Sequence, residues 1–241
     1  MRIAMWSGPR NLSTAMMYAF AARQDCGVVD EPFYAAFLKA SGEVHPMQEE
    51  ILASQPQSAD DVIAQCLGEA PNGKSVFYQK HMTHHMMPDF PMAWTDNVMN
   101  VFLLRHPARV IASYHEKREK PVLDDIGIRQ QALLFQRQLD KTGTPPVVID
   151  SDDLLVNPAA GLQALCEAIG IPYDPGMLHW SAGGNEADGV WASHWYNAVW
   201  ASTGLKASPM KPLPELDDEL QAVCEQALPY YRQLEPFKLK F

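Results

Sequence analysis

Two segments of the sequence place basic and hydroxyl side chains where a strand pattern gives way to a helix pattern. The first is residues 6–14, which read Trp-Ser-Gly-Pro-Arg-Asn-Leu-Ser-Thr and contain Arg10, Ser13 and Thr14. Backbone N–H groups and the positive end of a helix dipole converge at such a junction and favour a bound anion. The segment therefore predicts a phosphate site, although an arginine and a Ser-Thr pair also commonly cap a helix.

The second segment, residues 100–113, repeats this arrangement. Its strand-like run ends on Arg105, turns through His-Pro and enters a helix that carries Ser113 eight positions after the arginine. Open α/β sheets bind ligands beyond the carboxyl ends of their strands, and an arginine there can hold two phosphate oxygens at once. An isolated arginine would more simply pair with a surface carboxylate, but two such junctions in one chain argue against a chance arrangement.

Titratable side chains follow two other predicted strands. His81, His84 and His85 come after the run at 75–80, and Glu31 comes after the run at 27–30. An unperturbed imidazole titrates at about pH 6.5 and is well suited to act as a base, whereas a carboxylate needs burial to raise its pKa. The three histidines could also form a metal site, but the neighbouring sequence shows no carboxylate or cysteine pattern to complete one, so no metal is expected.

The elements that must position these residues alternate along the chain. Short apolar strand patterns lie at 2–6, 27–30, 75–80, 100–105 and 146–150. Helical patterns are expected at 12–20, 59–69, 107–114, 128–140, 158–169 and 215–228. This alternation predicts an α/β fold, a three-layer sandwich whose central, mainly parallel sheet is flanked by helices. Residues 1–241 are expected to form one domain, with the irregular, aromatic-rich stretch 181–214 packed over the site.

The composition of the chain indicates which binding partners are disfavoured. The chain has 47% hydrophobic residues and a formal net charge of -10, which disfavours binding to nucleic acid or to an anionic membrane surface. Its longest apolar run, residues 15–22, is too short to span a bilayer. The four cysteines are widely separated and form no CxxC pair. These features predict a cytoplasmic protein without nucleic-acid or membrane partners.

The two phosphate segments resemble those of sulfotransferases that use 3′-phosphoadenosine 5′-phosphosulfate (PAPS), which share a P-loop NTPase-like fold. The resemblance covers most of residues 1–180, including 154–158 and 170–174. It implies that one loop holds the 5′-phosphosulfate and that Arg105 and Ser113 hold the 3′-phosphate. The residues implied for the first loop are Pro9, Arg10, Asn11, Leu12, Ser13 and Thr14.

The resemblance also implies roles in catalysis. Arg10 would stabilise charge on the bridging oxygen as the sulfuryl group leaves. His81 is the nearest match to the family's usual histidine base, and Glu31 is the alternative, because other bacterial members use a glutamate after the second strand. Two departures stand out: Asn11-Leu12 replaces the usual Ser-Gly, and the usual Arg-Lys-Gly closing loop is absent, so that Lys206 or Lys211 would have to substitute.

The expected function is transfer of a sulfuryl group from PAPS, without a metal, to a hydroxyl or amine of a small-molecule acceptor. Two other classes stay open. A P-loop-like nucleotide kinase or phosphotransferase would need the lysine that normally follows the phosphate loop, and no glycine-lysine pair stands five and six positions after Gly8. A non-catalytic nucleotide-binding protein would keep Arg105 and Ser113 but would need no base. The sequence predicts neither the acceptor nor the oligomeric state.

Overall fold

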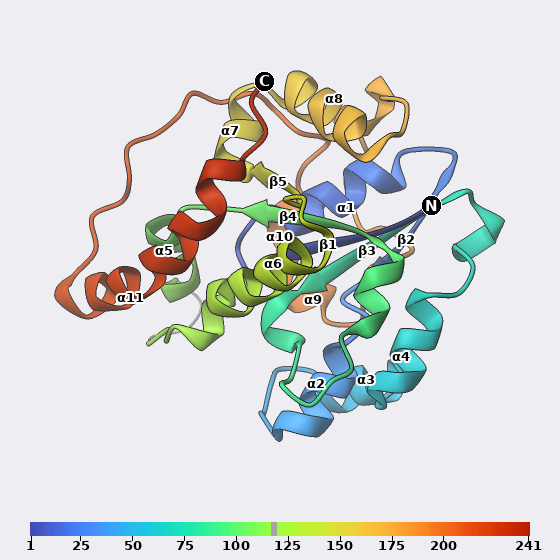
Figure 1. Ribbon diagram of the computed structural model, residues 1–241, viewed down its shortest axis with the longest axis horizontal. Coiled ribbons are helices and arrows are strands. Elements are labelled where there is room, and N and C mark those ends of the chain that lie inside the picture. Colours follow the sequence, from blue (N-terminus) through green and yellow to red (C-terminus); the bar gives the residue numbers. More distant parts are fainter. Residues whose placement is uncertain (117–119) are drawn as a thin grey trace.

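A five-stranded parallel sheet forms the centre of the molecule (Figure 1). The computed structural model describes residues 1–116 and 120–241. The strands are β1 (Arg2–Ser7), β2 (Cys26–Asp30), β3 (Val76–Met82), β4 (Met99–Leu104) and β5 (Val147–Asp150), in the order β2-β3-β1-β4-β5. Every adjacent pair is parallel. The five predicted strands and the predicted fold class are confirmed.

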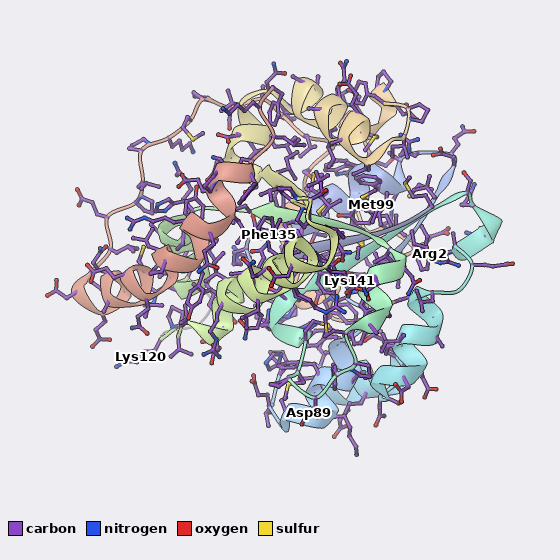
Figure 2. The ribbon with its side chains drawn as sticks, in the orientation of Figure 1. Arg2, Asp89, Met99, Lys120, Phe135 and Lys141 are labelled. Atoms are coloured by element: carbon purple, nitrogen blue, oxygen red, sulfur yellow. The ribbon has the colours of Figure 1, made fainter. Side chains whose placement is uncertain are left out.

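Helices cover both faces of the sheet because alternate residues of each strand point to opposite sides. On one face, Ile3 and Met5 of β1 pack with α1 (Ser13–Ala21) and α8 (Pro158–Ile169). On the other face, Ala4 and Trp6 belong to a second apolar cluster. Its helices are α4 (Ala59–Cys66), α5 (Pro107–His115), α6 (Ile128–Thr142) and α11 (Asp218–Leu234). Phe135 of α6, labelled in Figure 2, packs edge-on against Phe102 of β4 at 5.5 Å between ring centroids.

Short elements complete the structure around this sandwich. The remaining α-helices are α2 (Tyr34–Ser41), α3 (Gln48–Ser54), α7 (Ser151–Val156), α9 (Ala192–Trp195) and α10 (Asn197–Trp200). The 3₁₀ turns are Pro71–Gly73, Thr83–His85, Ala93–Asn97, Asp124–Ile126, Pro175–Leu178 and Glu235–Phe237. A third apolar cluster joins α2 to α9 through Tyr34, Trp191 and Tyr196. No helix in the described ranges has the length and apolar character needed to cross a bilayer.

The stretch 185–204, here called the cover, contributes Trp191 and Tyr196 to this third cluster and contacts α1 through the hydrogen bond from Tyr18 to Asp188. Most of it is irregular, as predicted, and it contains only the short helices α9 and α10. A single bridge between His179 and Gly204 closes its base. After it, the chain runs without regular structure to Asp217, with Leu205 buried and the Ser208 N–H bonded to the Leu155 carbonyl at 2.8 Å.

Gly8, directly after β1, has no room for a side chain. A Cβ atom there would lie 2.2 Å from the carbonyl oxygen of Ile126. Gly8→Ala should therefore displace the backbone and lower the free energy of unfolding by about 1–3 kcal/mol, measured by urea denaturation. Gly184→Ala is the matched control, because its nearest contact would be an ordinary 3.4 Å, and its stability should change by less than about 0.5 kcal/mol. Equal effects at the two glycines would contradict this account of the β1 loop.

Candidate active site

A cavity of about 390 Å³ opens beyond the carboxyl ends of the strands. In a parallel sheet these ends lie at one edge, so the segments that follow β1, β2, β3 and β4 come together there. Nine of the ten predicted site residues line it: Pro9, Arg10, Asn11, Leu12, Ser13, Thr14, Glu31, Arg105 and Ser113. His81 does not. Residues of the cover, including Trp195 and Tyr196, line the opposite wall.

The loop after β1 turns through two left-handed residues. Arg10 has φ 56° and Leu12 has φ 62°, a region that L-residues other than glycine seldom occupy. Leu12 is also the N-cap residue of α1, and its side chain cannot accept a hydrogen bond from the helix. Asn11 fixes the turn by donating from Nδ2 to the Leu103 carbonyl of β4 at 2.6 Å. The N-cap residue of α1 therefore makes no side-chain hydrogen bond to the helix, and Ser13 and Thr14 in the first turn line the cavity.

The two predicted phosphate loops touch each other. Arg10 donates from Nε to the Ser113 hydroxyl at 2.9 Å, and Arg105 donates from Nη1 to the Arg10 carbonyl at 2.7 Å. His106 and Pro107 set the start of α5, since the His106 ring accepts the Ala108 N–H at 3.2 Å and proline suits the first helical position. The contacts bring two guanidinium groups and one hydroxyl to the same part of the cavity wall.

A buried ionic network forms the other end of the site. Lys80 Nζ donates to Asp30 Oδ1 at 2.8 Å, to Glu31 Oε1 at 2.5 Å and to the Tyr196 hydroxyl at 2.6 Å. Strand register explains the first contact, because Asp30 of β2 pairs directly with Lys80 of β3. The lysine side chain is fully buried, and the Asp30 and Glu31 side chains are only 1% and 9% exposed. Glu31 Oε2 is left beside His85, whose Nδ1 lies 4.0 Å away.

Burial and charge act in opposite directions on the protonation of this network. Burial raises the pKa of Glu31, and the neighbouring Lys80 ammonium opposes that rise. Burial alone would lower the pKa of Lys80, but the two carboxylates outweigh it and the pKa is raised. The lysine therefore stays charged, whereas Glu31 is a stronger base than a carboxylate in water. A raised pKa makes a carboxylate better suited to accept a proton from an acceptor group.

His81 lies in the core, away from the cavity. Adjacent residues of a strand face opposite sides of the sheet, and Lys80 already faces the site. The His81 ring stacks on Trp6 at 4.5 Å, and its Nε2 lies 3.1 Å from Gln79 Oε1. Its side chain is almost wholly buried, and burial lowers its pKa to about 3. This placement does not suit the base role that the sequence predicted for His81, and it leaves Glu31 as the candidate at the cavity.

The two histidines after β3 do line the cavity. His85 is buried between Tyr34 and Phe37, with ring centroids at 4.5 and 4.8 Å, and burial holds its pKa well below the ordinary range. His84 lies edge-on to His85 at 4.4 Å. Across residues 1–116 and 120–241, no three histidine, cysteine or acidic side chains are grouped so that they could hold a metal ion.

Comparison with known proteins gives the family. The sequence pattern described as the sulfotransferase domain matches residues 1–237. The chain belongs to the sulfotransferase domain family. A solved sulfotransferase domain from the curacin biosynthetic pathway has the same fold, with a TM-score of 0.55 at 16% identity over 93% of this chain and 96% of that one.

Two plant proteins are similar to this sulfotransferase domain in sequence. They are branched-chain-amino-acid aminotransferase-like proteins 1 and 2 of Arabidopsis thaliana, 36% and 35% identical over 237 residues. The match covers 96% of this chain but only 41% of either plant protein. The sulfotransferase domain thus corresponds to less than half of each of these longer relatives.

Sequence reasoning missed two central residues of this sulfotransferase site, Lys80 and Tyr196. Strand alternation could have found Lys80, because a lysine inside a buried strand must meet a counter-charge. No sequence pattern marks Tyr196, which reaches the network from the cover. Of the two lysines expected as substitutes for the closing loop, Lys206 lines the cavity, whereas Lys211 does not and instead accepts a hydrogen bond from Arg109 at its carbonyl.

The burial of neutral His81 predicts a specific pH dependence of stability. The pKa is about 6.5 in an unfolded chain and about 3 in the folded one, so the unfolded state binds the proton more tightly. Stability should fall as the pH drops below about 6.5, by about 1.4 kcal/mol per unit. His81→Phe keeps a stacked ring and removes this titration, so between pH 7 and 5 it should lose about 2 kcal/mol less than the unaltered chain does in urea unfolding.

The control for that comparison is His115→Phe, at the exposed end of α5. It should keep the full loss of stability between pH 7 and 5. An unchanged loss in His81→Phe would show that His81 is not held neutral in the folded state.

Proposed function

We propose that residues 1–241 form one catalytic domain that transfers a sulfuryl group from PAPS to a hydroxyl or amine of a small-molecule acceptor. The observation that carries the proposal is the contact between the two strand-to-helix loops at one cavity, with Arg10 bonded to Ser113 and Arg105 bonded to Arg10. Glu31 lines the same cavity from the β2 end. Two phosphate-binding loops and one basic carboxylate are the groups that this reaction needs.

The residues present fit a donor that carries phosphate groups at the 3′ and 5′ positions of its ribose. The first loop offers the Arg10 guanidinium, the Ser13 and Thr14 hydroxyls and the N-terminus of α1, which together suit a 5′-phosphosulfate. Arg105 and Ser113 suit the 3′-phosphate. Lys206 lines the same cavity and adds a further positive charge. When bound, the donor supplies the sulfuryl group and leaves as adenosine 3′,5′-bisphosphate.

Glu31 and Arg10 then act on opposite sides of the reacting group. Glu31 Oε1 is held by Lys80, so Oε2 is the oxygen that takes the proton from the acceptor hydroxyl or amine. Arg10 stabilises the negative charge that grows on the bridging oxygen, which is a contribution made mainly in the transition state. Glu31 is buried, which strengthens the electrostatic effects that act on it.

Nucleotide preference tests the donor. Adenosine 3′,5′-bisphosphate should raise the melting temperature more than ADP does, because ADP lacks the 3′-phosphate for which Arg105 and Ser113 are placed. Arg105→Ala should weaken bisphosphate binding by roughly ten- to a hundredfold in calorimetric titration, since one charge-assisted contact contributes about 1.5–3 kcal/mol. Arg129→Ala, an exposed arginine paired with Asp124, is the control and should leave the affinity unchanged.

Equal stabilisation by the bisphosphate and ADP would contradict the assignment of the donor. Stronger stabilisation by ATP than by either would favour a nucleotide kinase or phosphotransferase instead. Tight bisphosphate binding without turnover of any acceptor would favour a non-catalytic nucleotide-binding protein.

Amide substitution tests the base. Glu31→Gln should lower the turnover number by about 10²–10⁴ while the affinity for the bisphosphate stays the same, because the amide cannot accept the acceptor's proton. His81→Phe should keep its turnover, since His81 lies outside the cavity. The assay is transfer of radiolabelled sulfate to an acceptor panel of phenols, aliphatic alcohols and amines. A fully active Glu31→Gln, or an inactive but folded His81→Phe, would reverse the choice of base.

A further inference from the structure

Tyr196 brings a hydroxyl group from the cover into the centre of the ionic network. The hydroxyl lies 2.6 Å from Lys80 Nζ, 2.9 and 2.8 Å from the two Asp30 oxygens, and 3.3 Å from Glu31 Oε1. It also accepts the indole N–H of Trp191 at 3.1 Å. The residue is almost fully buried, so no solvent could replace these contacts.

Polar contacts at two aspartates attach the cover to the rest of the domain. At Asp30, the Gly189 N–H donates to Oδ2 at 3.1 Å beside the Tyr196 contact. At Asp188, within the cover itself, one carboxylate oxygen accepts the Tyr18 hydroxyl of α1 at 2.6 Å and the Trp200 indole at 2.8 Å. Both attachments use a tyrosine and an aspartate, but only the one at Asp30 includes the candidate base.

We propose that Tyr196 is a positioning residue, which orients Lys80 toward Glu31. Proton transfer to Glu31 then depends on the position of the cover, which carries Tyr196. The inference rests on the proposed role of Glu31 as the base. A tyrosine hydroxyl has one hydrogen to donate and two lone pairs that accept. Here it accepts from Lys80 and Trp191 and donates its hydrogen to the carboxylates, of which Asp30 is the nearer.

The hydrogen bond from Tyr196 to Asp30 affects how strongly Lys80 stabilises the ionised form of Glu31. One ammonium faces two carboxylates. The Tyr196 hydroxyl donates to Asp30 in addition to Lys80 and the Gly189 N–H, and so leaves more of the lysine's charge for Glu31. Without the hydroxyl, Asp30 would compete fully for Lys80, and the ionised form of Glu31 would lose support. The other titratable groups facing Glu31 are His85, at 4.0 Å from Oε2, and Tyr34 on α2. His85 and Tyr34 carry no charge at neutral pH, because burial lowers the pKa of the first and raises that of the second.

Carboxyl titration by ¹³C NMR tests the inference directly, with the Glu31 signal assigned from its absence in Glu31→Gln. Tyr196→Phe should raise the pKa of Glu31 by about one unit, because one hydrogen bond to the network is lost. Tyr18→Phe is the matched control: it removes the hydroxyl from the other attachment of the same cover and should leave the Glu31 titration unchanged. An unmoved pKa in a folded Tyr196→Phe, or an equal shift in Tyr18→Phe, would overturn the proposal.

A second variant covers the case in which Tyr196→Phe does not fold. Asp30→Asn removes the competing charge, so it should lower the pKa of Glu31, a change opposite in sign to that in Tyr196→Phe. A pKa that stays the same or rises in Asp30→Asn would contradict the competition for Lys80 on which the role of Tyr196 depends.

Rate measurements separate this inference from the proposed function. In Tyr196→Phe the acid limb of the turnover profile should move to higher pH by the same unit, so that activity lost on the acid side returns as the pH is raised, with bisphosphate affinity unchanged. If the unaltered chain turns over no acceptor, the proposed function fails, and the NMR titration still decides the role of Tyr196. If it turns over an acceptor and Tyr196→Phe keeps the same profile, only the present inference fails.

Discussion

One lysine held between two carboxylates, all three removed from water, is the constraint on which the site depends. Removing a single partner from such a group typically costs about 3–5 kcal/mol, because an uncompensated charge is left buried. Lys80 therefore fixes the ends of β2 and β3 relative to each other, and Tyr196 brings the cover to the same point. The network carries one more negative than positive charge when both acids are ionised. Burial, followed by the charge of Asp30, raises the affinity of Glu31 for a proton against the opposing effect of Lys80.

The positive charge of the site lies elsewhere, around the loops after β1 and β4. Arg10 and Arg105 contact each other's segments, so the two loops form one wall. The left-handed backbone at Arg10 and Leu12 costs on the order of 1–3 kcal/mol at each residue. Such strain is tolerated where the surrounding structure fixes the turn, as the Asn11 contact with β4 does here. Cationic groups at one end and a basic carboxylate at the other suit the transfer of an anionic group to a neutral acceptor.

Much of this arrangement could be predicted from the sequence because its signals are local. Strand and helix periodicity gave the five strands and the sandwich, and Arg10, Arg105 and Ser113 stand at fixed offsets from the ends of β1 and β4. The base could not be ranked in the same way. His81 is favoured by its position after the third predicted strand, which matches the family's usual histidine, and by its residue type, but its neighbour Lys80 takes the face of β3 that meets the cavity. The side on which a residue of β3 lies follows from strand register and ion pairing.

The role of Tyr196 could not be predicted from such local signals. The partners of this tyrosine, Lys80, Asp30 and Glu31, are more than a hundred residues away in sequence, and it lies between the short helices α9 and α10, where no periodicity indicates a face. Long-range contacts between buried polar groups are therefore what the structure adds to the sequence.

The most direct test of the account is a crystal structure of the domain with adenosine 3′,5′-bisphosphate bound. The account predicts the 5′-phosphate on the loop from Pro9 to Thr14, the 3′-phosphate on Arg105 and Ser113, and Glu31 Oε2 facing the 5′-phosphate across a space open to an acceptor. Phosphates bound outside these two loops, or a Glu31 side chain turned away from the 5′-phosphate, would contradict it.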